Sequence, residues 1–433
     1  MSHSLRCYST SLGCPKNRVD TERLLGSLGV ELVPVDAPED ADLVFINTCA
    51  FIQPATEESV RTIAQAIADI EDLPKRPLLA VAGCLVGRYH ERELAPELPE
   101  VDLWLDNSSL EQWPAMIARK LGLPEPSAPG RLLSTGPSYA WLKISDGCRH
   151  ACSFCTIPSI RGRHRSHTKE LIVNEARGLL DQGVKELVLV AQDVTAWGCD
   201  LDGKPDLRVL LDELFPLSGL ERLRLLYLYP AGMTPEMLKY LRAAGKPFVP
   251  YFDVPVQHSH PDVLSRMGRP FARNPREVLD RIRNVFPEAA LRTSIMVGFP
   301  GETEEHFEHL RDFIEEVRFQ HLGVFAYRAE EGTPAAVMPD QIEDQVKEWR
   351  RDSLMELQAD LSAEWLAQFE NERLSILVDA PHPEWPGLHT GRAWFQAPEI
   401  DGLTYVSGPG VEPGALVEAD IVECRDYDLV ALA

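Results

Sequence analysis

Residues 139–155, YAWLKISDGCRHACSFC, decide the fold of the middle of this chain. The first six residues form a mostly apolar run that predicts a strand, and Gly147 lets the backbone turn into a short loop. That loop carries three thiols, at Cys148, Cys152 and Cys155. Three thiolates can hold three corners of a cubane iron–sulfur cluster and leave the fourth iron without a protein ligand, as a catalytic iron requires.

Structural zinc is the alternative for this loop. Zinc prefers four ligands, usually in paired C-x2-C groups, whereas the spacing here is C-x3-C-x2-C. His150 is a possible fourth ligand, but it lies inside the first spacer, where the geometry is cramped. Cys199, the next cysteine along the chain, lies well outside the loop. The spacing therefore favours an iron–sulfur cluster.

The segment that begins with the strand before this loop, at residue 139, alternates strand and helix patterns. The alternation predicts an α/β fold, a partial (βα)6 barrel of the TIM type, with its site at the carboxyl ends of the strands. A long charged helix is expected after it, at about 340–370. The expected strands are 139–144, 186–192, 223–229, 251–256, 291–297 and 321–327, and the expected helices are 169–181, 206–215, 234–244, 275–285 and 303–317.

The first part of the chain also alternates strand and helix patterns. Strand-like runs at 6–11, 41–47 and 77–82 predict parallel strands, with helices at 18–28 and 54–70. The sequence therefore predicts a separate α/β domain built on a parallel sheet.

A cysteine follows each of these three strands, at Cys14, Cys49 and Cys84, with equal spacing (49 − 14 = 35; 84 − 49 = 35). Ligands of an open α/β sheet gather at the carboxyl ends of its strands, so the three thiols are expected to converge there. A second cluster is the prediction. Single buried cysteines are more often small core residues, which is the expectation for the other three, Cys7, Cys199 and Cys424.

The last part of the chain predicts a small antiparallel β-barrel. Short β-rich runs at 374–378, 393–395, 404–406 and 416–422 are separated by Gly and Pro turns. A Pro-, Gly- and Ser-rich segment before the strand at 139–144 predicts a linker. The expected division is 1–122 for the first α/β domain, 123–138 for the linker, 139–368 for the partial barrel with its trailing helix, and 369–433 for the small barrel.

Charge narrows the possible partners. The net charge of the chain is −24, and residues 369–433 contain twelve Asp and Glu against three Lys and Arg. Such a field repels phosphate backbones and attracts basic proteins, so nucleic acid is not expected as the main substrate. A solvated acidic surface without a partner is the plain alternative. Residues 1–12 lack the features of a signal peptide and no apolar run is long enough for a bilayer span, so we expect a cytoplasmic enzyme without a membrane partner.

The cysteine loop after the first strand of a six-strand βα segment resembles the radical S-adenosylmethionine (SAM) superfamily, and SIMVGFPGE at 294–302 is similar to a later strand and turn of that family. The resemblance implies that SAM binds the open iron and is cleaved to a 5′-deoxyadenosyl radical. It implies nucleotide contacts at Phe154, Gln192, Gly298 and Glu302. Core packing is the alternative for Phe154, a helix cap for Gln192-Asp193, and a generic turn for 294–302. No catalytic residue is identified.

The first domain resembles that of the methylthiotransferases in three short motifs, SLGCPKN at 11–17, NTC at 47–49 and AGC at 82–84. This resemblance implies SAM and two [4Fe–4S] clusters, the second on Cys14, Cys49 and Cys84. In that family one SAM methylates a sulfur held at the second cluster. The radical from another SAM removes hydrogen from the target carbon, which then takes the methylthio group.

The choice of substrate depends on features that are less specific than the cysteine motifs. SLGCPKN and Glu330-Glu331-Gly-Thr333 resemble the branch that modifies the β-carbon of an aspartate in small-subunit ribosomal protein twelve, and the last domain resembles TRAM, here acidic enough to suit a basic ribosomal protein. The partners then implied are that protein, free or on the ribosome, a reductant such as flavodoxin or ferredoxin, and a sulfur donor. A transfer RNA adenosine methylthiotransferase and a non-catalytic metal-stabilised binding protein are the alternatives.

Two further groups of residues have open roles. Arg161, Arg163, Arg165 and Lys169 either orient the carboxylate of the nucleotide or the target aspartate, or form a solvated loop. Gln257-His258 is expected at the barrel mouth, where His258 is either functional or a core histidine whose hydrogen bonds are satisfied.

Overall fold

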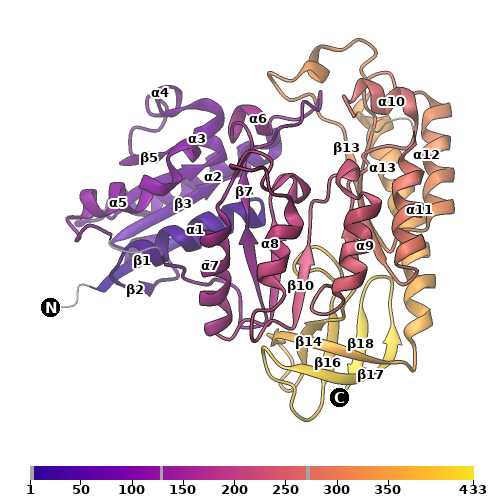
Figure 1. Ribbon diagram of the computed structural model, residues 1–433. Helices are drawn as coiled ribbons and strands as arrows, with labels where there is room; N and C mark the ends of the chain where they lie inside the picture. Colours follow the sequence, from indigo (N-terminus) through magenta and orange to yellow (C-terminus); the bar gives the residue numbers. More distant parts are fainter. Residues whose placement is uncertain (1–3, 127–129, 270–273) are drawn as a thin grey trace. The chain divides into compact units, whose positions relative to one another are not determined.

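The computed structural model describes residues 4–126, 130–269 and 274–433 (Figure 1). The chain divides into two compact units. The first comprises residues up to 134 together with 146–150 and 155–164, and the second comprises 135–145, 151–154 and 165–433. The domain limits expected from the sequence stay predictions. No helix in the described ranges is long and apolar enough to cross a membrane.

The first unit is built on a five-stranded sheet in the order β2-β1-β3-β4-β5. All four neighbouring pairs are parallel, so the predicted parallel sheet is confirmed. The short edge strands β2 and β5 were not expected from the sequence. The strands are β1 (Ser4–Ser11), β2 (Glu31–Pro34), β3 (Leu43–Thr48), β4 (Leu78–Gly83) and β5 (Leu103–Leu105).

Helices cover both faces of this sheet, so β3 and β4 are buried on both sides. In β3, Val44 and Ile46 pack in one buried cluster with α2 and α3, while Leu43 and Phe45 pack in another with α1 and α5. The helices are α1 (Pro15–Ser27), α2 (Gln53–Ile70), α3 (Cys84–Tyr89), α4 (Glu91–Leu94), α5 (Trp113–Leu121) and α6 (Ile157–Ile160), with 3-10 turns η1 (Pro38–Asp40) and η2 (Asn107–Gln112).

The second unit contains six parallel strands in chain order, in two ladders, β6-β9-β10 and β11-β12-β13. The N–H of Leu228 donates to Asp253 O at 2.9 Å and joins the ladders. Because β6 and β13 do not pair among the described residues, the barrel is incomplete, as predicted. The strands are β6 (Tyr139–Lys143), β9 (Glu186–Val190), β10 (Arg222–Leu225), β11 (Tyr251–Asp253), β12 (Ala290–Val297) and β13 (His321–Ala326).

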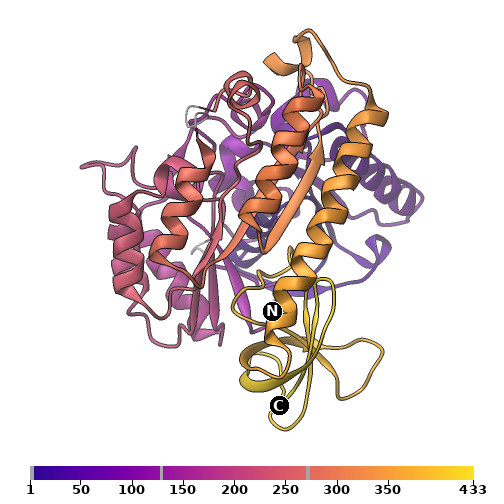
Figure 2. The same cartoon turned by 90° about the vertical axis from the view of Figure 1, so that its right-hand side faces the viewer.

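The helices of this unit form an outer layer along the strands (Figures 1 and 2). Thr168, Thr234 and Thr303 each cap a helix by accepting a backbone N–H with the hydroxyl. The helices are α7 (Lys169–Asp181), α8 (Leu207–Leu214), α9 (Pro235–Ala244), α10 (Pro261–Arg266), α11 (Pro275–Val285), α12 (Glu304–Val317) and α13 (Asp344–Leu366). The shorter elements are β7 (Ser145–Asp146), β8 (Arg165–Ser166), η3 (Val194–Ala196), η4 (Pro230–Gly232), η5 (Pro334–Val337) and η6 (Ala367–Phe369).

The chain ends in a closed five-stranded barrel in the order β14-β15-β16-β18-β17. Four pairings are antiparallel, but β16 and β18 pair in parallel. The strand expected at 393–395 is wrong. The chain turns there, because the Gln396 side-chain oxygen accepts the N–H of Ala393 at 2.9 Å. The backbone N–H of Gln396 in turn donates to Ala393 O at 3.1 Å. The strands are β14 (Arg373–Pro381), β15 (His389–Arg392), β16 (Thr404–Ser407), β17 (Leu416–Cys424) and β18 (Leu429–Leu432).

The small barrel packs against the amino ends of the six parallel strands (Figures 1 and 2). Glu186, the first residue of β9, forms an ion pair with Arg392 at 2.7 Å, and the Tyr251 hydroxyl at the start of β11 donates to Asp401 at 2.7 Å. The side chains of Tyr139, Arg222 and His321, also at strand starts, contact this barrel in the same way. The barrel therefore lies at the end of the strands opposite their carboxyl ends.

Candidate functional site

Cys14, Cys49 and Cys84 lie at the carboxyl ends of three adjacent strands of the first unit. Cys14 precedes α1 after β1, Cys49 directly follows β3, and Cys84 begins α3 after β4. Since β1, β3 and β4 are neighbours in the sheet, the fold brings the three cysteines to one edge. We call them the sheet cysteines.

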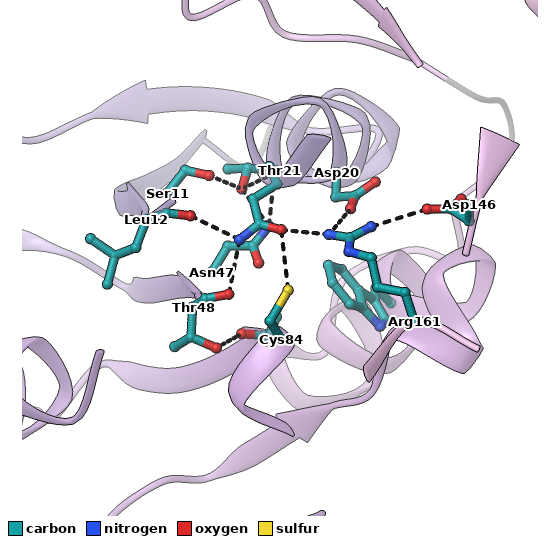
Figure 3. Close-up of polar contacts among 12 residues, drawn as sticks. Ser11, Leu12, Asp20, Thr21, Asn47, Thr48, Cys84, Asp146 and Arg161 are labelled. Atoms are coloured by element: carbon teal, nitrogen blue, oxygen red, sulfur yellow. Dashed lines mark hydrogen bonds and ion pairs between the residues drawn. The ribbon is translucent and has the colours of Figure 1, made fainter. Parts of the chain in front are cut away.

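A buried hydrogen-bond network holds the turns that carry the sheet cysteines (Figure 3). The Asn17 side-chain amide donates to Leu12 O at 2.8 Å and to Thr48 O at 2.9 Å. The Asn47 amide donates to Asn17 O at 2.8 Å, and the Thr48 hydroxyl donates to Ala82 O at 2.5 Å. The asparagines and threonine of the SLGCPKN and NTC motifs thus fix the three strand ends relative to one another.

Gly13 allows the first of these turns to approach the second. Its φ is +84°, and a Cβ at this position would lie 2.6 Å from Cys49 Cβ and 2.7 Å from Cys49 Sγ. No other residue type fits, because both the conformation and the space exclude a side chain.

The three sheet cysteines differ in the pKa of their thiols because their surroundings differ. Burial opposes ionisation of Cys14, but Lys16, Arg161 and the backbone N–H groups at the start of α1 outweigh burial and lower the pKa of this thiol. Burial, with a smaller contribution from Cys84, raises the pKa of Cys49 to about 12. Burial also raises the pKa of Cys84. Cys14 is therefore the thiol most ready to act as a thiolate ligand.

Arg161 is buried beside the sheet cysteines, so the solvated-loop interpretation is wrong for this member of the basic run (Figure 3). Its guanidinium donates to Asp146 at 3.0 Å and to Asp20 at 3.3 Å, and it also bonds the Asn17 side-chain oxygen. Burial lowers its pKa, but Cys84, Asp20, Asp146 and Cys14 together hold that pKa well above the ordinary value.

The other three members of the run lie nearer to solvent than Arg161. Arg163 and Arg165 are exposed, and the partly exposed Lys169 forms an ion pair with Glu213 at 3.0 Å.

Cys148, Cys152 and Cys155, which we call the loop cysteines, are partly buried. Gly147 has a φ of +68°, and a Cβ there would lie 2.2 Å from Arg163 O. The N–H of His150 donates to Cys148 Sγ at 3.5 Å, so this segment folds back on its first cysteine. In the second unit, Arg269 donates to Cys152 Sγ at 3.7 Å.

The spacing of the thiols tests which metal group they suit. Two sulfurs bound to one zinc ion at about 2.3 Å each can be no more than about 4.6 Å apart. Within the described ranges, none of the six cysteines belongs to a group of three potential ligands whose atoms all lie within 4.8 Å of one another. Within these ranges no three of the thiols are therefore arranged as ligands of a single zinc ion.

Gln192 and Asp193 follow β9 and have different roles. Asp193 caps η3, because its carboxylate accepts the Thr195 N–H at 2.9 Å. Both polar atoms of the Gln192 amide are buried without a hydrogen-bond partner. A buried unpaired amide is costly, which is the pattern of a group that awaits a ligand.

The remaining expected nucleotide contacts lie near the carboxyl ends of β11–β13. Phe154 is partly buried and packs against a core cluster that includes Phe299 and Tyr327. One oxygen of Glu302 accepts the N–H of Gly298 at 2.9 Å, and the other accepts Arg350 at 2.8 Å. The carboxylate of Glu302 thus holds the turn, and the role of these residues toward a nucleotide stays a prediction.

His258 is a buried histidine held by the fold. Its Nδ1 accepts the N–H of His260 at 2.9 Å, and its Nε2 lies 3.7 Å from Glu302 Oε2. Burial, with added repulsion from nearby His306, His260 and His309, lowers its pKa well below the usual value. Nδ1 is therefore satisfied, whereas Nε2 is buried without a hydrogen-bond partner, so the role of His258 stays a prediction.

Cys7 lies in the first unit's core, and the Cys424 thiol donates to Leu366 O at 3.2 Å. Both therefore fit the interpretation as ordinary packing residues. Sequence reasoning missed Arg269, whose guanidinium lies over the Tyr229 ring at 5.2 Å and reaches Cys152. No local signal distinguishes this arginine, because its contacts come from distant strand ends.

Three family models match the chain. They are the radical SAM superfamily over residues 142–314, the uncharacterized protein family UPF0004 over 6–106, and the TRAM domain over 372–433. A ribosomal protein uS12 methylthiotransferase RimO from Nitratidesulfovibrio vulgaris is 70% identical over 426 residues, which cover 98% of this chain and 99% of that protein. Its namesake from Lawsonia intracellularis is 62% identical over 433 residues, covering 100% and 98%.

Among solved structures, the radical S-adenosylmethionine methyltransferase TsrM from Kitasatospora setae, with cobalamin and a [4Fe–4S] cluster bound, matches with a TM-score of 0.57 and 15% identity. The match covers 92% of this chain and 82% of that one. At this identity the likeness shows the fold alone.

Proposed function

We infer that this chain, which belongs to the family of ribosomal protein uS12 methylthiotransferases, adds a methylthio group to the β-carbon of an aspartate in uS12. The observation that carries the proposal is the identity of 70% over nearly the whole of both chains. The alternation of strands and helices alone would fit many other reactions.

The enzyme uses SAM and two [4Fe–4S] clusters. We assign one cluster to the loop cysteines and the other to the sheet cysteines. When bound, the first supplies the electron and the open iron for SAM cleavage, and the second supplies an iron that presents sulfur. The chain contributes the six thiols, the low-pKa Cys14 among them, and the rigid turns that hold the sheet cysteines in place.

We assign nucleotide binding to Gln192, Gly298, Glu302 and Phe154. The unpaired amide of Gln192 can donate to and accept from a polar ligand. Glu302 contributes indirectly, because its carboxylate is used to shape the turn at Gly298. Phe154 adds an apolar surface beside that turn.

The surface of the small barrel supports a basic protein as substrate. Its two exposed arginines are both in ion pairs, Arg373 with Asp420 at 3.5 Å and Arg425 with Glu423 at 2.8 Å. A surface of this charge repels RNA and attracts a basic ribosomal protein. The exposed acidic residues are Glu370, Glu372, Glu384, Glu399, Glu412, Glu418, Asp420, Glu423 and Asp426.

The barrel docks its partner at a distance from the chemistry. It contacts Glu186 at the start of β9, whereas Gln192 lies six residues further along, about 20 Å for an extended chain. A reductant such as flavodoxin or ferredoxin, a sulfur donor and a cytoplasmic location complete the proposal, since the substrate belongs to the ribosome.

The test is anaerobic reconstitution followed by reaction with uS12. We expect about eight irons per chain and, with SAM, reductant and sulfide, a methylthio adduct on one aspartate by mass spectrometry. Replacement of that aspartate by asparagine in uS12 is the matched control and should give no adduct. Methylthiolation of transfer RNA with uS12 unmodified would show that the substrate is wrong. Iron-loaded protein that forms no 5′-deoxyadenosine would instead favour a non-catalytic binding protein.

A further inference from the structure

Arg161 stands out among the buried charged residues of the first unit, because it lies beside residues proposed to bind a cluster. Its side chain is 2% exposed, as is that of Asp20, and Asp146 is 7% exposed. The Asn17 side-chain oxygen accepts from Arg161 and lies 3.8 Å from the Cys84 sulfur, which donates to it. The guanidinium and this thiol therefore share one small buried volume.

The donors of Arg161 suit a sulfur-rich neighbour. A guanidinium has five N–H donors in a fixed fork, so it can hold Asn17, Asp20 and Asp146 and still donate to sulfur. The two carboxylates fix its orientation, because each receives one edge of the fork. The group remains positively charged at any physiological pH.

A cluster on the sheet cysteines would place three thiolates in this buried region. Buried negative charge is costly unless a cation compensates it. Hydrogen bonds and positive charge near the sulfurs of a cluster also favour its reduced form.

We propose that Arg161 is a positioning residue of the sheet-cysteine cluster, holding the Cys84 ligand by a charge-assisted bond and raising the reduction potential of that cluster. The proposal rests on the assignment of a cluster to Cys14, Cys49 and Cys84. Arg161 follows Cys155 by six residues on the same segment, so the segment that bears a loop cysteine also tunes the sheet cluster.

Arg131 provides a matched control. Its side chain is 4% exposed in the same unit, and it pairs with buried Glu22 at 2.7 Å. Glu22 lies eight residues after Cys14, about 12 Å along α1. Arg131→Gln therefore removes a buried ion pair of the same kind away from the thiols.

The test uses the full chain with Cys148, Cys152 and Cys155 replaced by alanine, so that only the sheet cysteines can hold a cluster. Arg161→Gln, Arg161→Lys and Arg131→Gln are made in this background, and iron content, melting temperature and a redox titration followed by EPR are measured. For Arg161→Gln we expect the ratio of reduced to oxidised cluster at a fixed potential to fall at least tenfold, about 59 mV for one electron. Arg161→Lys should recover most of this change because it keeps the charge.

Arg131→Gln should lower the melting temperature without moving the potential. A folded Arg161→Gln protein that holds less iron than the Arg131→Gln protein would also support the proposal. An unchanged potential in Arg161→Gln, or equal losses in both glutamine variants, would overturn it. A background protein without iron would instead contradict the cluster assignment itself, so the two failures are distinguishable.

Discussion

The loop cysteines lie within eight residues of one another, whereas neighbouring sheet cysteines are separated by 35 positions and meet because three strands pair side by side. In the first set the covalent chain enforces proximity. In the second it depends on sheet register and on the network of Asn17, Asn47 and Thr48. Point substitutions in the sheet should therefore dismantle the second set while leaving the first intact.

Gly13→Ala should give the largest effect, because it should remove the cluster of the sheet cysteines and leave that of the loop cysteines. The added Cβ would lie 2.7 Å from Cys49 Sγ, so the turn must move and the sheet cysteines should lose their cluster. Iron should fall from about eight to about four per chain, with 5′-deoxyadenosine formation retained. Gly29→Ala is the control, since Gly29 also has a positive φ, of +70°, but a Cβ added there would meet nothing within 4 Å. Equal iron loss in both variants would mean that backbone strain alone is responsible.

Asn17→Ala should weaken the same site through the network. The substitution leaves the carbonyls of Leu12 and Thr48 without their amide donor, which costs about 2–6 kcal/mol at about 1–3 kcal/mol for each group. Chemical denaturation measures the loss, and alkylation of the cysteines in the metal-free protein should accelerate for the sheet set only. The exposed Asn174→Ala serves as control. Faster alkylation of the loop set as well would show that the two sites are not independent.

Acid should destabilise the second unit before the first, because a buried ion-pair network around Glu186 lies in the second unit. Burial opposes ionisation of Glu186, but Arg224, Arg392 and Arg222 outweigh it and lower its pKa from 4.5 to about 2. The stabilisation is present above pH 4.5 and lost as the pH falls toward 2, in total about 3 kcal/mol. Hydrogen exchange should show β9 losing protection over this range before the sheet of the first unit does.

Glu186→Gln is the control for this pH effect. It should be less stable at pH 7 and should show a flatter pH dependence, because the titrating group is gone. If the parent protein and this variant have the same acid dependence, another carboxylate is responsible.

Ser59→Ala should have the smallest effect. Ser59 lies on α2, accepts the Cys49 N–H at 3.0 Å and donates to Cys49 O at 2.7 Å. Its loss should cost about 1 kcal/mol, seen as a lower melting temperature with iron content unchanged. Thr62→Ala removes a hydroxyl that bonds within the same helix, at Glu58 O, and should cost less. If the two variants behave alike, the sheet site depends less on its network than these hydrogen bonds indicate.

The sequence was sufficient for the features that depend on local pattern. The strands before Cys148, Cys49 and Cys84 follow from apolar runs, and the strand before Cys14 follows from the strand and helix alternation around it. The expected strand at 393–395 failed because the pattern there is apolar, while a side chain, Gln396, decides that the chain turns.

Arg161 shows why the rest of the site could not be predicted. In the sequence it is one member of a basic run, and its partners Asn17 and Asp20 lie more than 140 residues away. The parallel pairing of β16 with β18 and the contact of Arg392 with Glu186 are likewise long-range, so no local pattern indicates them.

The contact of the small barrel with the amino ends of the parallel strands also bears on how this enzyme can evolve. Selection can change an outward carboxylate such as Glu384 or Glu418 without moving Gln192 or any sheet cysteine, because these act at the other end of the strands or in the other unit. With the substrate-binding role proposed for the barrel, a change of substrate and a loss of the chemistry would require separate mutations. A barrel of different charge that keeps the contacts with Glu186, Tyr251 and His321 should give an enzyme with a new substrate and the same reaction.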